Sequence, residues 1–396
     1  MVCILTIKIC NDMNILVLSS FFSRFYVLLA DYLNSEGHTT TMHFVLLEEN
    51  SIENNMPFVI VPDSSSILSD RNTTTIVDYV REHNIDVVLF PQLSNANTLV
   101  KQIKGIDEKI ACLYLLHSCP NFVVADKKRQ FKEMSLRSVT SIKKLLAYLL
   151  PNLYLFVLKQ IWRHWARVQY DLYDKIIVLS HSYIEEYKML MGQDDYDSKI
   201  KAVPNPLIYY QSNHPVHLKK KQIAFVGRFS LEKGVHRLIH VWKIVQSKLP
   251  DWNMVLVGDG PLKNQIENLA KDLCLERISF IGYTSSIPVI DESAIICLTS
   301  NIEGQPTVFM EAMQLGVVPI AFNSFSAINA MIDNEVNGVI VPAFDIQLYA
   351  DKLVELASDE DKRCLMGLNA INKVKQYDIS YVGRLWLSIF EALKIF

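Results

Sequence analysis

Short apolar runs recur along the chain at spacings that predict strands alternating with helices. In the first half, the runs that predict strands lie at 13–18, 41–47, 58–62, 85–90, 111–117, 175–180 and 202–203. Segments with helical period lie between them, at 21–36, 73–84, 93–103 and 182–191. This alternation favours a parallel sheet with helices on both faces.

The alternation restarts after a polar, lysine-rich stretch at 211–221, which we interpret as a linker. Strands are predicted at 223–226, 254–257, 278–281, 295–299, 317–322 and 339–341, with helices at 235–248, 262–273, 307–315, 326–332 and 348–357. The predicted fold class is therefore α/β, with two tandem Rossmann-like open parallel-sheet domains. Because such sheets bind ligands at the carboxyl ends of their strands, we expect a site in the cleft between the domains.

The predicted domains are an N-terminal domain at 13–205, with a basic helical insertion at 127–170, and a C-terminal domain at 206–375. We expect a final helix within 376–396 to pack back on the N-terminal domain, and residues 1–12 to be an extension of no structural weight. Half of the 396 residues are hydrophobic and the net charge is −3, which excludes a disordered chain. No apolar run reaches the length of a membrane span.

The seven cysteines are an odd number and form no Cys-x-x-Cys pair, as is typical of a reduced, cytoplasmic protein. The thirteen glycines are unevenly spread: three precede residue 205 and ten follow it. Because glycine lets the backbone approach a ligand, we expect phosphate-binding loops mostly in the C-terminal half.

Two loops of that half combine glycine with charge or tight turns. In the first, Gly227 ends a strand, and Arg228 and Lys233 lie five residues apart at a helix start, which suits a diphosphate. The alternative is a solvated turn. In the second, Gly258 and Gly260 precede a helix-starting proline, and the alternative is a plain strand-to-helix turn.

Two further loops follow the next strands. Tyr283 stands at a strand end where a base or ribose could pack, and otherwise is an ordinary half-buried aromatic. In the last loop, Glu303 precedes a predicted helix N-terminus formed by Gly304, Gln305, Pro306, Thr307 and Val308. Glu311 follows within apolar residues, where a carboxylate needs a partner. Ribose hydroxyls would serve, and a structural ion pair is the alternative.

Together the four loops resemble those of the retaining glycosyltransferases of family 4, which have the two-domain GT-B fold. The resemblance rests on Gly-Arg-x4-Lys-Gly at 227–234, Val-Gly-Asp-Gly-Pro-Leu at 257–262, Glu-x7-Glu at 303–311 and Asn-Gly-x-Ile-Val-Pro at 337–342. These motifs lie in the family's order and spacing over about residues 220–375.

The resemblance implies that Arg228 and Lys233 bind the donor diphosphate and that Glu311 holds the ribose. Glu303 and the backbone at 304–308 would contact the transferred sugar. His117, at a strand end, is similar to the histidine that family members place near that sugar; its alternative is a core histidine. Two departures stand out: the loop at 19–24 has no glycine, and Gln305 replaces the usual aromatic residue.

The implied reaction moves a sugar from a nucleoside-diphosphate sugar to a glycan or lipid-linked acceptor, with retention, in cell-surface polysaccharide or lipopolysaccharide synthesis. We expect no metal requirement, because protein cations take the metal's place; the Asp195-Tyr196-Asp197 match is short and common. Two alternatives remain open: a GT-B-type sugar-nucleotide epimerase, and a catalytically silent nucleotide-sugar-binding protein.

Residues 127–167 carry ten Lys or Arg residues against one acid, interleaved with leucines and aromatic residues. This pattern is typical of interfacial helices on an anionic leaflet, and the hypothesis is peripheral binding to the cytoplasmic membrane face. The alternative is a helical insertion with a solvated basic face. A nucleic-acid partner is disfavoured because the rest of the chain is acidic.

Overall fold

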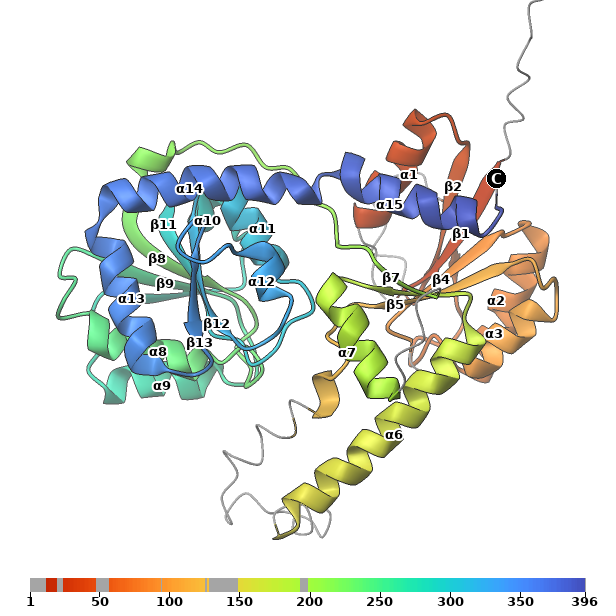
Figure 1. The fold of residues 1–396 in the computed structure, drawn as a ribbon, viewed down its shortest axis with the longest axis horizontal. Helices are drawn as coiled ribbons and strands as arrows, with labels where there is room; N and C mark the ends of the chain where they lie inside the picture. The colour runs from red at the N-terminus through yellow and green to blue at the C-terminus, as the bar shows by residue number, and fades with distance from the viewer. Residues whose placement is uncertain are drawn as a thin grey trace, which may run out of the picture. The chain divides into compact units, whose positions relative to one another are not determined.

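The computed structural model describes residues 12–19, 24–47, 57–93, 95–124, 127, 149–192 and 199–395. The chain divides into two compact units, drawn in Figure 1. The first unit consists of Met1–His117, Gln160–Pro206 and Ile379–Phe396, and the second of Ser118–Lys159 and Leu207–Asp378. Each unit contains one parallel sheet flanked by helices, which confirms the predicted fold class.

The sheet of the first unit has seven strands in the order β3-β2-β1-β4-β5-β6-β7. Their bounds are β1 Met13–Leu18, β2 Thr40–Leu46, β3 Phe58–Ile60, β4 Val87–Pro91, β5 Ala111–Leu116, β6 Lys175–Val178 and β7 Ile200–Ala202. All six pairings are parallel. Every residue of β5 is buried, as expected for a central parallel strand covered on both faces.

In the described ranges, six longer helices belong wholly or partly to this unit: α1 Arg24–Ser35, α2 Asp70–Glu82, α3 Asn97–Lys104, α6 Pro151–Leu172, α7 His181–Met191 and α15 Ile379–Ala392. Helix α2 begins three residues before its predicted start, because the Ser69 side chain accepts the Asn72 amide and caps it. Helix α15 packs beside α1 and puts Trp386 and Phe390 into the core of the first unit. At Gly383, a Cβ would lie 2.1 Å from the Tyr32 ring, so the two helices meet closely there.

The sheet of the second unit has six parallel strands in the order β10-β9-β8-β11-β12-β13. The strands are β8 Lys220–Val226, β9 Asn253–Val257, β10 Ile278–Gly282, β11 Ser293–Leu298, β12 Val318–Asn323 and β13 Val339–Pro342. The helices are α8 Val235–Val245, α9 Lys263–Asp272, α10 Ile287–Glu292, α11 Thr307–Gln314, α12 Ile328–Met331, α13 Ile346–Ser358 and α14 Glu360–Val374. The strand order reverses between β8 and β11, and such switch points are where open sheets bind ligands.

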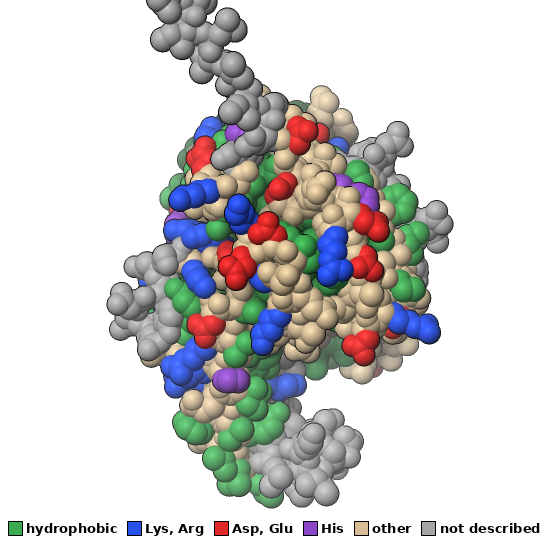
Figure 2. Space-filling view, turned by 90° about the vertical axis from the view of Figure 1, so that its right-hand side faces the viewer, with side chains coloured by type: hydrophobic (Ala, Val, Ile, Leu, Met, Phe, Trp, Pro, Cys, Tyr) green, Lys and Arg blue, Asp and Glu red, His purple; other side chains and the backbone are tan. Residues whose placement is uncertain are grey.

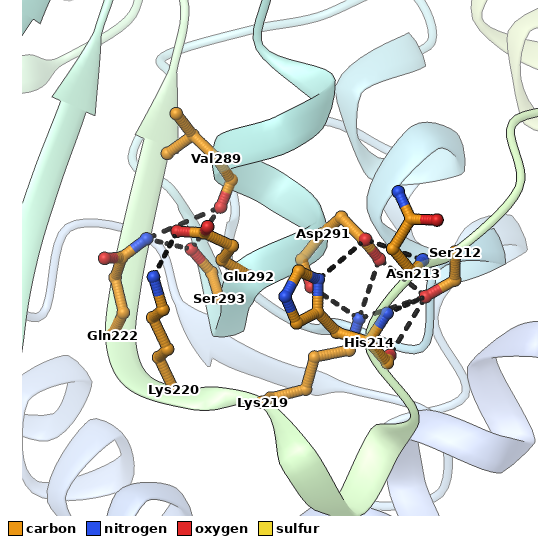
Figure 3. Close-up of polar contacts among 10 residues, drawn as sticks. All are labelled: Ser212, Asn213, His214, Lys219, Lys220, Gln222, Val289, Asp291, Glu292 and Ser293. Carbon is orange, nitrogen blue, oxygen red and sulfur yellow. Dashed lines mark hydrogen bonds and ion pairs between the residues drawn. The ribbon is translucent and has the colours of Figure 1, made fainter.

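A buried carboxylate fixes the stretch that was predicted to be a linker (Figure 3). Asp291, at the end of α10, accepts hydrogen bonds from Ser212 Oγ at 2.5 Å, the Asn213 amide at 2.9 Å and His214 Nδ1 at 2.9 Å. Lys219 Nζ lies 3.1 Å from the same carboxylate and 2.6 Å from the Asp291 carbonyl oxygen. The stretch is therefore anchored, and β8 begins at Lys220, within the predicted linker.

Candidate functional site

The loops that follow β8 and β9 pack backbone against backbone. The Gly227 amide donates to Val257 O at 3.0 Å, and the Phe229 amide donates to Asp259 O at 2.8 Å. A Cβ on Gly258 would lie 2.0 Å from Gly227 O, and one on Gly260 would lie 2.6 Å from Phe229 O. Glycine is therefore needed at both positions because the neighbouring loop leaves no room for a side chain.

The loop after β8 is also fixed to the loop after β11. Gly234 starts α8 with φ +63°, and a Cβ there would lie 2.1 Å from Thr299 O. The Thr299 hydroxyl donates to the carbonyl oxygens of Lys233 and Gly234 at 3.2 and 3.1 Å, and Asn301 Nδ2 donates to Leu231 O at 3.0 Å. The two loops on either side of the switch point thus form one connected rim.

An ion pair lies on this rim. Lys233 Nζ donates to Glu303 Oε1 at 2.7 Å and to Oε2 at 2.9 Å, and the Ser300 hydroxyl donates to Oε1 at 2.6 Å. Glu303 is 9% exposed, so its carboxylate is held in one orientation. The sequence predicted both residues for the site but assigned them to different parts of a ligand; the structure brings their charged groups into direct contact.

Arg228 differs from Lys233 in its surroundings. Its side chain is exposed, and its guanidinium makes no hydrogen bond or ion pair with any other residue that the structure describes. Since a guanidinium presents five N–H donors, Arg228 is available to bind a phosphate from the rim.

Helix α11 begins at Thr307, three residues after Gly304. Pro306 has an extended conformation as its N-cap, and the amides of Thr307 and Val308 donate to no backbone oxygen in the described chain. These unsatisfied amides and the helix dipole favour an anion at this end of α11. Gln305 is 9% exposed and its amide donates to Met310 Sδ at 3.2 Å, so it lies inward rather than in solvent.

Glu311 is half-buried on α11, and burial raises the pKa of its carboxyl group. No hydrogen bond or ion pair joins it to another described residue, so the alternative of a structural ion pair finds no support in the described part of the chain. A desolvated carboxylate without donors is suited to hydroxyl groups of a ligand.

Tyr283 follows β10 and is 92% exposed, so the interpretation as a half-buried aromatic is wrong. The Gly258 amide, in the loop after β9, donates to the carbonyl oxygen of Gly282 at 2.8 Å. Tyr283 therefore directly follows the residue through which β10 is joined to the loop after β9. An exposed ring there is free to stack on a planar ligand.

His117 lies in the first unit, directly after β5. It lines a small pocket with apolar neighbours that include Leu179, Val203 and Trp386. Burial lowers the pKa of His117 to about 4, so the imidazole is neutral near pH 7 and has both a donor and an acceptor nitrogen. This environment suits either a core histidine or a neutral hydrogen-bonding group in a site.

Sequence reasoning missed Thr299, Ser300 and Asn301, which hold the rim together and orient Glu303. Their signal was a run of three polar residues directly after an apolar strand, and all three are buried. Ser20 to Ser23 of the glycine-free loop, Asp195 and Asp197 lie outside the described residues. Within the described ranges, no group of three His, Cys, Asp or Glu side chains is arranged to hold a metal.

Comparison with known proteins finds a family match within the second unit. Residues 210–373 match the family described as Glycosyl transferases group 1. An uncharacterized glycosyltransferase of Haemophilus influenzae is 30% identical over 218 residues, covering 54% of this chain and 61% of that protein. The chain thus spans less than two thirds of that relative's length.

A second relative, from Campylobacter jejuni, is 27% identical over 258 residues, covering 63% of this chain and 66% of its own length. Its name is GalNAc-alpha-(1->4)-GalNAc-alpha-(1->3)-diNAcBac-PP-undecaprenol alpha-1,4-N-acetyl-D-galactosaminyltransferase. Among solved structures, Anabaena HepE in complex with UDP-glucose is similar with a TM-score of 0.71 at 17% identity, over 97% of this chain and all of that one. The fold is therefore the GT-B fold.

Proposed function

We propose that this protein is a retaining glycosyltransferase of the family 4 type, which moves a sugar from a nucleoside-diphosphate sugar to a glycan or lipid-linked acceptor. The observation that carries the proposal is the 2.7 Å contact between Lys233 and Glu303, which joins two separate motifs at the switch point of the second sheet. The family match over 210–373 supports the reaction class, and the UDP-glucose complex of HepE supports the donor class.

The leaving group sets the main chemical demand, because negative charge develops on the β-phosphate as the sugar departs. In the proposal, Arg228, the third N–H of the Lys233 ammonium and the free amides at the start of α11 stabilise that charge from fixed positions. Because these groups supply the positive charge, the proposal includes no metal ion.

The remaining site residues have proposed roles in orientation. Glu311 accepts the ribose hydroxyls, Tyr283 stacks on the base, and Glu303 contacts the transferred sugar from the position that Lys233 and Ser300 hold. Gln305 occupies the position of the usual aromatic and would shape the sugar pocket. A role for His117 beside the transferred sugar stays a prediction.

The acceptor class is proposed from the relatives. The Campylobacter jejuni protein is named for a glycan linked to undecaprenol, which is a long isoprenoid alcohol. We therefore place this protein in cell-surface polysaccharide or lipopolysaccharide synthesis, working from the cytoplasm at the inner face of the membrane.

The first test is a thermal-shift panel of UDP-, GDP- and ADP-sugars on the full chain. At about 100 times the Kd, a bound donor stabilises by about 2.7 kcal/mol, which corresponds to a rise in Tm of about 5–10 °C for a unit of this size. Lys233→Gln should remove this rise. Lys248→Gln is the matched control, because Lys248 forms an exposed ion pair with Asp351. An equal rise in both variants would contradict the proposal.

The second test separates the reaction from its alternatives. With a donor identified, the anomeric configuration of the transferred sugar is followed by NMR, and retention is expected. Conversion of the donor to an epimer without acceptor would instead assign an epimerase. A donor that binds but is neither transferred nor hydrolysed, with candidate acceptors present, would assign a silent binding protein.

A further inference from the structure

Among the residues that the structure describes, helix α6 is buried at its carboxyl-proximal end. Its buried residues are Ala166 and Gln169, and Gln169 Nε2 donates to Asn97 Oδ1 at 3.1 Å. Arg163 Nε and Arg167 Nε donate to Leu190 O at 3.2 Å and Met191 O at 2.9 Å, where they satisfy the last carbonyls of α7. The carboxyl-proximal half of α6 is therefore anchored.

The amino-proximal half of α6 instead presents apolar side chains to solvent. Six apolar side chains have 48–60% of their surface exposed: Leu149 and Leu150 just before α6, and Leu153, Phe156, Val157 and Ile161 on it. We call these six residues the α6 stripe. In Figure 2 hydrophobic side chains gather at the lower end of the molecule, where α6 lies in Figure 1.

The α6 stripe has the geometry of one helix face. At about 100° per residue, Leu153, Phe156, Val157 and Ile161 span about 140° of the circumference. On the same wheel, Ala166 and Gln169 point to the opposite side. The stripe therefore lies on the side of α6 opposite to Ala166 and Gln169, which are buried at the anchored end.

Charge around the stripe is of one sign. From 149 to 170 the sequence contains no Asp or Glu, and Lys159 and His164 are exposed on the same helix. The structure describes four of the cations at 127–167. Two of them, Arg163 and Arg167, donate to the last carbonyl oxygens of α7 and so cap that helix. The apolar side chains, rather than a free basic face, are thus the main exposed feature of α6.

We propose that the α6 stripe inserts into the headgroup region of an anionic lipid surface, with α6 lying along that surface. An amphipathic helix with an aliphatic and aromatic face, and with cations but no acids over 149–170, has the chemistry of interfacial helices. Among the described helices, none is both long and apolar enough to cross a bilayer, so the stripe lies on the surface. The choice of a lipid surface as the partner rests on the proposed function, because a lipid-linked acceptor would be presented at such a surface.

The test is co-sedimentation of the full chain with phosphatidylglycerol–phosphatidylcholine vesicles, without donor. Leu153→Ser/Phe156→Ser should lower the partition coefficient at least tenfold. Leu365→Ser/Leu368→Ser on α14 is the matched control, with side chains 61% and 53% exposed, and should bind like the wild type. Raising NaCl to 0.5 M should weaken binding less than the Leu153/Phe156 change does, because insertion is mainly apolar.

Three results would overturn the inference. The first is equal vesicle binding by the wild type and the Leu153/Phe156 variant, or no binding by either. The second is a fall in Tm of several degrees in that variant, since this would show that the chain itself covers the stripe. The third is a wild-type dimer that the variant dissociates. Donor binding is measured separately by thermal shift, so either proposal can fail while the other stands.

Discussion

Asp291 offers the sharpest test of what stabilises the second unit. Replacing it by Asn keeps the shape and removes the charge that faces Lys219, whose side chain is 3% exposed. Burial alone would raise the pKa of Asp291. The hydrogen bonds from Ser212 and His214 oppose this effect and contribute to lowering the pKa to about 2. Relative to an ordinary Asp, this shift corresponds to about 2 kcal/mol of stability.

Losing the charge of one partner of a buried pair adds to this cost, because the Lys219 ammonium then faces only neutral acceptors, such as the Asp291 carbonyl oxygen at 2.6 Å and Ser212 Oγ at 3.5 Å. Removing one member of such pairs typically costs about 3–5 kcal/mol. We expect Asp291→Asn to cost about 3 kcal/mol and to lower the Tm of the second unit by about 6–12 °C. Differential scanning calorimetry of the full chain measures this.

Glu292→Gln is the neighbouring control. Glu292 pairs with Lys220 at the surface, with side chains 36% and 57% exposed, and such pairs contribute less than about 1 kcal/mol. The pH dependence has a definite sign. Because the folded pKa of Asp291 is lowered, its contribution is present above pH ~4 and is lost as pH falls toward 2. A Tm for Asp291→Asn equal to that of Glu292→Gln would refute the reasoning.

Three other predictions concern the site and the first unit. Glu311→Gln should weaken donor binding at least tenfold, which calorimetric titration measures. It should leave the Tm unchanged or slightly higher in a thermal-shift assay, because burial already disfavours the charged form of Glu311. Transfer should continue in EDTA at the untreated rate, and a loss restored by Mg²⁺ would contradict the proposed use of protein cations. Burial lowers the pKa of His43 to about 4, so the contribution of His43 to stability should fall by about 3 kcal/mol as pH drops from 6.5 to 4. His43→Gln should reduce that slope in urea unfolding.

The sheets were predictable because their central strands are buried on both faces. β1, β4, β5, β9 and β11 are nearly continuous apolar runs, and a run of that kind is visible without any alignment. Helix ends were less predictable, since a single capping side chain such as Ser69 decides where α2 begins. The short α10 was missed because six residues with a proline carry too little helical period.

The site residues were predictable as motifs, but their contacts were not. Lys233 and Glu303 are separated by 69 intervening positions in the printed sequence, and their contact depends on the conformation of Gly234 and on the Thr299 hydroxyl. Nothing in local spacing encodes that geometry. The exposure of Tyr283 and the absence of a described partner for Glu311 likewise depend on which loops pack together.

Helix α15 has a consequence for synthesis on the ribosome. The first unit lacks Trp386 and Phe390 until all of residues 207–378 have been translated, which takes roughly 10–35 s at ordinary rates. During that interval the Tyr32 side of α1 has no cover from α15, whereas the second unit is continuous from 207 onward and can fold as it emerges. The half of the protein made first is therefore the half completed last, and nascent-chain chaperones would have the longest access to the surface of α1.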